Sequence, residues 1–261
     1  MATIAKNTPP AAKAPVRSLT NRLLAAVGAE ALTRLLPQME LVTLAVGDVL
    51  YAAGTANEYV YFPEDTVISH VYFSEAGASV EAAMVGREGA SGLCGMVNGT
   101  RSKHTAVAIF GGAALRARVE DLAGEMIANQ PLQSVLYEYT AAYSAEVGQR
   151  VACGAFHMAD ERLCSWLLTL QDRAQNDRMI ITHEEMATFL GINRASISSI
   201  AKRLKDKGLI NYVRGKLSII DRPRLESLAC ECYSPRGRVD SIPRRTHKGR
   251  SNRSYLSQHG S

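Results

Sequence analysis

Residues 182–209 of this chain read THEEMATFLGINRASISSIAKRLKDKGL, and this stretch decides how the second half of the protein folds. Thr182, followed three residues later by Glu185, is a capping box that starts a helix. Gly191 supplies the backbone freedom that a tight corner needs, and Asn193 is a good N-cap for a second helix. The stretch therefore predicts two short helices joined by a tight turn.

The second predicted helix has one apolar face and one polar face. Its apolar residues recur at three- and four-residue spacing and form one stripe, which comprises Ile197, Ile200, Ala201 and Leu204. The opposite face carries Arg194, Ala195, Ser198, Ser199 and Lys202. This is the helix-turn-helix pattern, in which short polar and basic side chains reach into the DNA major groove. An ordinary helical hairpin with a solvated face is the alternative.

The segment that follows the two helices favours DNA binding. Residues 210–220, INYVRGKLSII, alternate apolar and polar positions around a turn at Arg214, Gly215 and Lys216. A small hairpin with a basic tip is typical of a winged helix, whose tip meets the phosphate backbone.

Two runs carry a resemblance to a known family. ITHEEMATFLGINRASISSIAKRLKDKGLI at residues 181–210, and RGKLSIIDRPRLESLA at residues 214–229, resemble the carboxy-terminal DNA-binding domain of the Crp/Fnr superfamily of bacterial transcription regulators. The resemblance extends more weakly over about residues 20–230. It implies an α+β chain with a cyclic-nucleotide-binding-like β-roll (a jelly roll), a long dimerisation helix and a C-terminal winged helix-turn-helix.

The N-terminal half independently predicts many short strands. Glycine-punctuated segments with a period of two occur at residues 41–46, 48–51, 59–62, 66–73, 79–85, 105–110 and 114–119. A helix over residues 19–36 precedes them and stops at Pro37. The expected organisation is a disordered tail (1–18), a β-roll sensor domain with its leading helix (19–125), a dimerisation helix (126–155), a winged helix-turn-helix domain (156–232) and a basic disordered tail (233–261).

The expected effector pocket departs from the family pattern. Nucleotide-binding members carry a Gly-Glu pair and, about a dozen residues later, an Arg before Ser-Ala or Thr-Ala. Here Gly92 matches, but Leu93 stands in place of the Glu, and His104 stands in place of the Arg ahead of Thr105. Leucine cannot accept ribose hydroxyls, and a mostly neutral imidazole is a poor phosphate clamp. We therefore expect no cyclic AMP binding, unless Arg101 or Lys103 takes over through a shift in loop register.

One helical seam is expected to join two copies of the chain. Leu132, Leu136, Tyr139 and Tyr143 follow one another at spacings of four, three and four, and Val147 continues at four. This period is coiled-coil-like and predicts a dimer seam. A helix that lies on its own β-roll is the alternative, and one seam could serve both uses.

Composition and cysteine use narrow the class of protein. No run of 18 uncharged apolar residues occurs, so no membrane span is expected, and five scattered cysteines fit a reducing cytoplasm. A net charge of +5 and a pI near 9.0 permit nucleic-acid binding. His70 and His104 look isolated, and Cys230 and Cys232 lack partners, so no metal, no cofactor and no enzyme activity are expected.

These patterns predict a homodimeric, sequence-specific, cytoplasmic transcription regulator. Arg194 is expected to read bases, with Ser196, Ser198, Ser199 and Lys202 sharing base and phosphate contacts. Backbone contacts are expected from Thr182, Asn193, Arg214 and Lys216. The family pattern Arg-Glu-x-x-x-Arg is broken by Ala195 and Ser199, so the common operators of the family should not be carried over.

The expected partners are a near-palindromic double-stranded DNA site, a second copy of the chain and RNA polymerase. The effector, the operator sequence and the choice between activation and repression do not follow from the sequence. The alternative function is a ligand-sensing or protein-interaction module with weakened, non-specific DNA binding.

Overall fold

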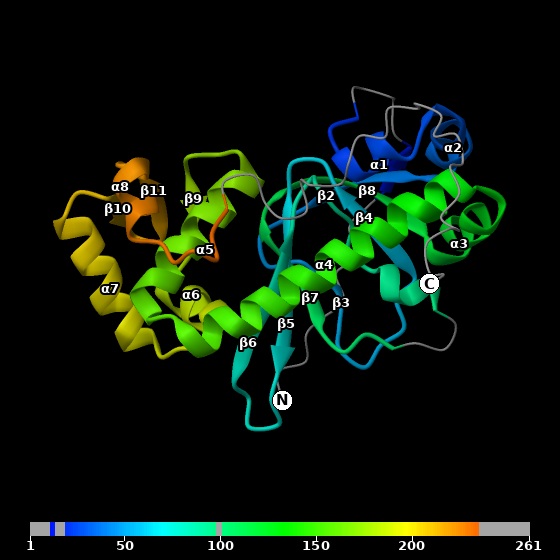
Figure 1. Cartoon of the computed structure of the whole chain (residues 1–261). Helices are drawn as coiled ribbons and strands as arrows, with labels where there is room; N and C mark the ends of the chain where they lie inside the picture. The colour runs from blue at the N-terminus through cyan, green and yellow to red at the C-terminus, as the bar shows by residue number, and fades with distance from the viewer. Residues whose placement is uncertain (1–10, 14–18, 98–100, 235–261) are drawn as a thin grey trace, which may run out of the picture.

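The protein is an α+β chain in which one long helix links a β-rich N-terminal domain to a smaller C-terminal domain (Figure 1). The structure is a computed structural model that describes residues 11–13, 19–97 and 101–234. Figure 1 shows the long helix α4 (Gln130–Phe156) crossing the whole molecule between the two domains. This is the predicted architecture. No helix among the described residues is both long and apolar enough to cross a membrane.

Two four-stranded antiparallel sheets form the N-terminal domain, called the sensor domain below. The first has the order β1 (Ala11–Lys13), β2 (Glu40–Leu44), β8 (Gly112–Arg118) and β4 (Tyr59–Pro63). The second has the order β3 (Val49–Tyr51), β7 (Thr105–Phe110), β5 (Val67–Phe73) and β6 (Ser79–Val85). All seven predicted strands are present. The prediction of a disordered tail over 1–18 is wrong for residues 11–13, because β1 pairs with β2.

The leading helix of the sensor domain is broken in two. α1 (Arg22–Ala26) and α2 (Ala29–Leu35) replace the single predicted helix, because Gly28 adopts a φ of 88° between them. A short 3₁₀ turn, η1 (Leu36–Gln38), follows α2. Leu23, Leu24 and Leu35 are buried here in one apolar cluster with β4, β8 and α4.

The face that α4 turns toward the sensor domain corrects the predicted dimer seam. α3 (Val119–Ala128) ends at Asn129, whose side chain caps the start of α4 by accepting a hydrogen bond from the Leu132 amide. Leu132, Leu136 and Tyr139 are buried against the chain's own β-roll, and Tyr143 and Val147 are half-buried. The apolar spacing was read correctly, but the stripe is occupied within the chain.

The C-terminal domain is built around α5 (Ala159–Ala174), which begins three residues after α4 ends. The break between the two helices, at residues 157–158, is called the hinge below. Trp166 of α5 is fully buried and stacks on Phe189, with ring centroids 5.7 Å apart. The other elements are β9 (Met179–Ile180), α6 (His183–Leu190), α7 (Arg194–Asp206), β10 (Ile210–Val213), β11 (Lys216–Ile219) and α8 (Arg222–Ser227). The basic tail over 235–261 lies outside the described residues.

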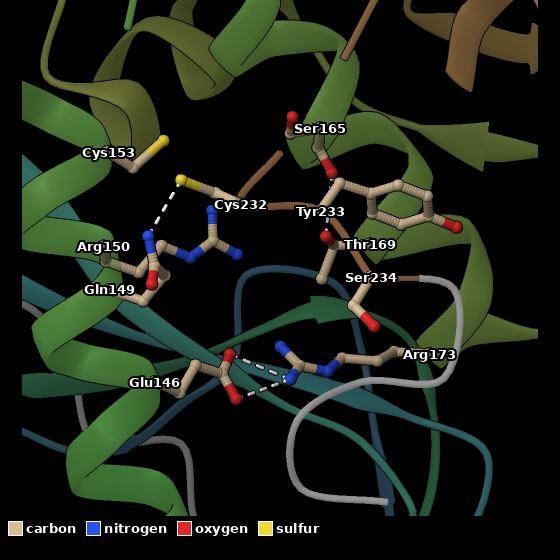
Figure 2. Close-up of a pocket in the computed structure, with 10 residues that line it drawn as sticks. All are labelled: Glu146, Gln149, Arg150, Cys153, Ser165, Thr169, Arg173, Cys232, Tyr233 and Ser234. Atoms are coloured by element: carbon tan, nitrogen blue, oxygen red, sulfur yellow. Dashed lines mark hydrogen bonds and ion pairs between the residues drawn. The ribbon is translucent and has the colours of Figure 1, made fainter. Parts of the chain in front are cut away.

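Buried polar contacts join the two domains. Arg173 of α5 forms ion pairs with Glu88 of the sensor domain at 2.9 Å and with Glu146 of α4 at 2.8 Å. Figure 2 shows Arg173 and Glu146 in direct contact with each other, in the lining of a small cavity of about 70 Å³ between α4 and α5. Burial acts to lower the pKa of Arg173, but the two carboxylates outweigh it and raise the pKa. Glu88 belongs to the loop 86–89, so that loop supports the domain interface.

Candidate functional site

The helix-turn-helix has the caps that the sequence predicts. The Thr182 hydroxyl accepts a hydrogen bond from the Glu185 amide at 3.1 Å, while the Glu185 carboxylate accepts one from the Thr182 amide at 2.7 Å. Gly191 closes α6 with a φ of 63°, and the Asn193 side chain accepts a hydrogen bond from the Ser196 amide at 2.7 Å. These contacts fix the angle at which α7 leaves α6.

The outer face of α7, the predicted recognition helix, is exposed at Arg194 and at Lys202. The Arg194 side chain is 69% exposed, and its Nε lies 3.7 Å from a carboxylate oxygen of Glu184, which is also exposed. Ser199 and Lys202 are exposed on the same helix. Ion pairs between exposed side chains contribute little, so Glu184 holds the Arg194 side chain only weakly.

Ser198 is held inward by a neighbour that the sequence did not identify. Its hydroxyl lies 2.9 Å from Nδ1 of His183, and the His183 ring stacks on Tyr212 of the wing at 4.5 Å. Burial, and secondarily Arg194, lowers the pKa of His183. Ser198 therefore braces α7 against α6 and the wing through a neutral imidazole, and Ser196 beside it is half-buried.

The wing is a tight hairpin with a basic tip. β10 and β11 are joined by a two-residue turn, in which Arg214 has a φ of 50° and Gly215 has a φ of 79°. Positive φ at both central positions defines a type I′ turn, whose twist matches the strands. Arg214 and Lys216 are exposed, and Arg178, just before β9, lies with them around one hollow. Arg178 is not among the predicted DNA contacts, although a basic residue next to a short strand can indicate one.

A cavity of about 590 Å³ lies between the β-roll and α4, and we call it the sensor pocket. Gly92, Leu93 and His104 line it, as predicted. Position 92 requires glycine, because its φ is 102° and a Cβ there would lie 2.5 Å from the Tyr59 carbonyl oxygen. Thr105 is not among the residues that line the cavity, since its hydroxyl accepts a hydrogen bond from the Ala53 amide.

A chain of imidazole and phenol groups forms the polar end of the sensor pocket. His70 and His104 are side by side, with ring centroids 4.2 Å apart, so the interpretation of both as isolated is wrong. The Tyr51 hydroxyl lies 3.0 Å from Nε2 of His104, and the Tyr143 hydroxyl lies 2.5 Å from Nδ1 of His70. Burial lowers the pKa of His104 to about 4 and holds that of His70 well below its ordinary value. Both rings are therefore neutral near pH 7.

Cationic side chains are absent from the described part of the sensor pocket. Its lining is otherwise mostly apolar and includes Ala90, Met96, Val97 and Met126. Arg101 is exposed and donates a hydrogen bond to the Gly54 carbonyl, and Lys103 is also exposed. The described residues thus offer an uncharged surface with a few hydroxyl and imidazole groups.

Four potential metal ligands meet elsewhere in the chain. Cys230 and Cys232 were expected to lack partners, but Cys153 and His157 lie beside them. The sequence could not show this, because the two pairs are separated by more than 70 residues and meet only through the fold.

Residues 161–228 match the family described as the Crp-like helix-turn-helix domain. The C-terminal domain is therefore similar to Crp-like helix-turn-helix domains, and we call it the Crp-like domain. It spans α5 to α8 and contains the predicted recognition helix α7 and the wing. A search of curated proteins gives no match.

Solved structures of Crp/Fnr regulators share the fold of most of the chain. FixK2 from Bradyrhizobium japonicum is 17% identical, with a TM-score of 0.63 over 74% of this chain and 98% of that chain. A transcriptional regulator of the CRP family from Thermus thermophilus is 18% identical, with the same TM-score and the same coverage of 74% and 98%. The c-di-GMP responsive global regulator CLP from Xanthomonas campestris is 12% identical, with a TM-score of 0.61 and coverage of 74% and 99%. The chain therefore has the Crp/Fnr regulator fold, with a Crp-like helix-turn-helix domain.

Proposed function

We propose that this protein is a homodimeric, sequence-specific transcription regulator of the Crp/Fnr type, acting on bacterial DNA in the cytoplasm and without enzyme activity. The observation that carries the proposal is the exposed face of α7, with Arg194 at its start, on a Crp-like helix-turn-helix domain. A guanidinium matches the two acceptors of a guanine edge in the major groove. Arg214 and Lys216 on the wing, together with Arg178, supply charge for the phosphate backbone.

Base reading in this proposal depends on few side chains. Arg194 is the principal reader, while Ser199 and Lys202 are exposed one and two turns further along α7. Ala195 can offer only a methyl group to the groove. Thr182 and Asn193 are engaged through their side chains as helix caps, and the Thr182 amide also donates to Glu185. Phosphates would therefore meet the backbone amides of the residues that follow these caps, in the first turns of α6 and α7.

A different face of α4 is suited to the dimer contact. Exposed residues recur at alternating spacings of four and three, and comprise Tyr137, Ala141, Ser144, Gly148, Val151 and Ala155. This is a heptad-like period, and its small side chains allow two helices to approach closely. Val151 is 71% exposed and Tyr137 is 59% exposed in the single chain. A dimer through this face would present two α7 helices to half-sites about 34 Å apart.

The sensor pocket favours an uncharged, largely apolar effector over cyclic AMP. An anionic phosphate needs a cation or several donors, and His70 and His104 are neutral because of burial. The phenols of Tyr51 and Tyr143 and the two imidazoles could instead hydrogen-bond one polar group of a small ligand.

Selection of bound genomic fragments by the full chain, followed by fluorescence anisotropy, tests the function. The expected result is a near-palindromic site that binds about 10³-fold or more tightly than a shuffled competitor at the same salt concentration. Added cyclic AMP should leave this ratio unchanged. Equal binding to both DNAs would favour the alternative, a ligand-sensing or interaction module with non-specific DNA binding, and would refute the regulator as proposed.

A further inference from the structure

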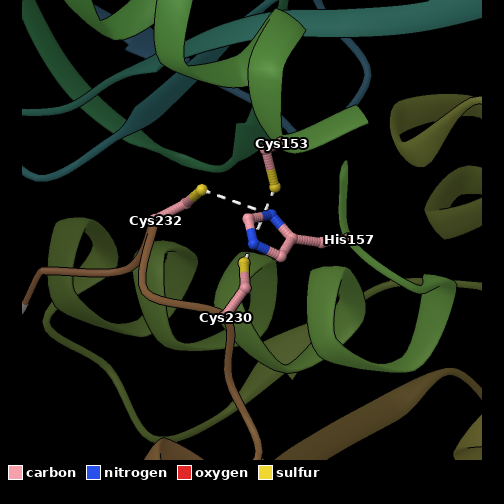
Figure 3. A group of neighbouring side chains, drawn as sticks. All are labelled: Cys153, His157, Cys230 and Cys232. Atoms are coloured by element: carbon pink, nitrogen blue, oxygen red, sulfur yellow. Dashed lines mark hydrogen bonds between the residues drawn. The ribbon is translucent and has the colours of Figure 1, made fainter. Parts of the chain in front are cut away.

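Three cysteines and one histidine meet at the junction between the long helix and the C-terminal domain. Cys153 lies on the last turn of α4, and His157, four residues later, caps that helix on the same face. Cys230 and Cys232 follow α8 at the other end of the C-terminal domain. Figure 3 shows the three thiols around the imidazole of His157, and the four ligand atoms all lie within 4.8 Å of one another.

The spacing of these atoms suits a single tetrahedral ion. Sγ of Cys153 lies 3.6 Å from Sγ of Cys230, and Sγ of Cys232 lies 3.5 Å from Nδ1 of His157. Zinc bonds of about 2.3 Å to sulfur and about 2.0–2.1 Å to nitrogen place tetrahedral ligands roughly 3.5–3.8 Å apart. A disulfide needs sulfurs about 2.05 Å apart, so the Cys153–Cys230 pair is set for a ligand geometry and not for a covalent bond.

Contacts around the four side chains also favour a metal site. Nε2 of His157 lies 3.0 Å from a carboxylate oxygen of Glu231, which orients the ring so that Nδ1 faces the thiols. A carboxylate behind a histidine ligand is the usual outer partner of a zinc site. Gln149 donates a hydrogen bond to Sγ of Cys232 at 3.0 Å, and this donor would stabilise a thiolate there. The Ser165 hydroxyl lies 3.0 Å from Sγ of Cys230 and fixes its position.

We propose that Cys153, His157, Cys230 and Cys232 bind one Zn²⁺ ion. Three thiolates and one imidazole are a ligand set of structural zinc sites, and four protein ligands leave no open position for a substrate. The ion joins the end of the C-terminal domain, at Cys230 and Cys232, to the last turn of α4. It thereby closes a loop around the whole helix-turn-helix domain and holds α5 at a set angle to α4, next to the hinge at residues 157–158.

Metal content tests the proposal without any use of DNA, so its outcome is independent of the proposed regulatory function. The full chain, purified under reducing conditions, should contain one zinc per chain by elemental mass spectrometry. After removal of the metal with a chelator, Co²⁺ should bind one to one with the intense visible absorption of tetrahedral thiolate cobalt. Zn²⁺ should also protect three of the five thiols from alkylation in the folded protein.

Ligand variants and a matched cysteine control sharpen the result. Cys153→Ser, Cys230→Ser and Cys232→Ser should each lose stoichiometric zinc, whereas Cys94→Ser should keep it, because Cys94 lies in the sensor domain beside Asn57. Glu231 is exposed, so Glu231→Gln should leave the fold intact and weaken Co²⁺ affinity by about 10- to 100-fold.

Three results would overturn the zinc site. The first is a folded wild-type chain that contains no zinc and gives no cobalt spectrum. The second is recovery of a Cys153–Cys230 disulfide from the native protein, which would make the pair a redox couple. The third is retention of zinc by Cys232→Ser with an unchanged cobalt spectrum, which would exclude the four-ligand site.

Discussion

The indole N–H of Trp166 donates a hydrogen bond of 2.9 Å to the carboxylate of Glu81, and this contact joins the first helix of the Crp-like domain to strand β6 of the sensor domain. The other carboxylate oxygen accepts a hydrogen bond from the Ser69 hydroxyl at 2.6 Å. Nη2 of Arg150, on α4, lies 3.8 Å from the oxygen that Trp166 contacts. Glu81 is therefore a shared acceptor for both domains and for the helix between them.

Replacing Glu81 should destabilise the chain through Trp166. Glu81→Ala leaves the buried indole N–H without its acceptor, which costs about 1–3 kcal/mol, whereas Glu81→Gln keeps an acceptor and should cost less. Urea unfolding, followed by the fluorescence of Trp166, the single tryptophan, measures the loss of stability in each variant. Glu75→Ala in the exposed β5–β6 turn is the control and should be neutral. Equal losses for Glu81→Ala and Glu75→Ala would contradict the coupling role.

Removing the Arg194 guanidinium should reduce sequence discrimination. Arg194→Ala should cost about 1–3 kcal/mol on the selected site and relax specificity at one base, because a bidentate contact to guanine is lost. Anisotropy titrations against selected and shuffled DNA at one salt concentration measure this. Arg34→Ala, on α2 of the sensor domain, makes the same charge change and should affect neither DNA. Equal weakening on both DNAs by Arg194→Ala would assign the residue to phosphate binding.

The wing should contribute charge without sequence preference. Lys216→Ala should weaken binding to every DNA and reduce the slope of log K against log salt by about one unit, since one counterion fewer is released. Titrations across a range of salt concentrations give the slope, with Lys103→Ala in the sensor domain as the control. A slope that stays the same would place Lys216 outside the DNA contact.

Charge on the exposed face of α4 should prevent the proposed dimer. A Cβ at Gly148 would meet no atom within 4 Å in the single chain, so Gly148→Glu fits the monomer but sets two carboxylates against each other in a pair of helices. Light scattering should show a monomer, and affinity for the two-half-site DNA should fall at least about tenfold. Gly124→Glu on α3 is equally open and should stay dimeric. A dimeric Gly148→Glu chain would move the interface to another surface.

The neutral histidines of the sensor pocket should make stability depend on pH. The pKa of His104 is lowered to about 4 in the folded chain, while the ordinary pKa of histidine is about 6.5. The contribution of His104 to the free energy of unfolding is therefore complete above about pH 6.5 and is lost as the pH falls toward 4. His70 acts in the same direction. Acidification over this range should cost about 1–3 kcal/mol through His104. Denaturant unfolding at several pH values should show a flatter dependence for His104→Gln, and an identical dependence would remove His104 as its source.

Local sequence rules were sufficient to predict the structure of segments that depend only on neighbouring residues. The Thr182–Glu185 box, the corner at Gly191 and the cap at Asn193 each depend on neighbours within three residues, and all three are present. The strands of the β-roll were also predictable, since short apolar segments of period two between glycine turns indicate strands.

Contacts between distant segments were not predictable from those rules. The stripe of Leu132, Leu136 and Tyr139 shows that α4 packs on something, but periodicity does not say whether the partner is a β-roll or a second helix. His70 and His104 meet because β5 pairs with β7, and Cys153 meets Cys230 because the whole C-terminal domain folds back on α4. Each of these requires the tertiary structure.

The corner of the helix-turn-helix is also where the sensor domain touches the Crp-like domain. A Cβ placed at Gly191 would lie 3.3 Å from a methyl carbon of Val80 in strand β6, and Val71 and Met84 share one buried cluster with Trp166. The unit that could be transplanted to another protein is thus larger than the segment after the hinge. A chimera with a different sensor domain would need a segment that replaces the β5–β6 hairpin. Without such a segment, the apolar surface of the Crp-like domain that packs on the hairpin would be exposed to solvent.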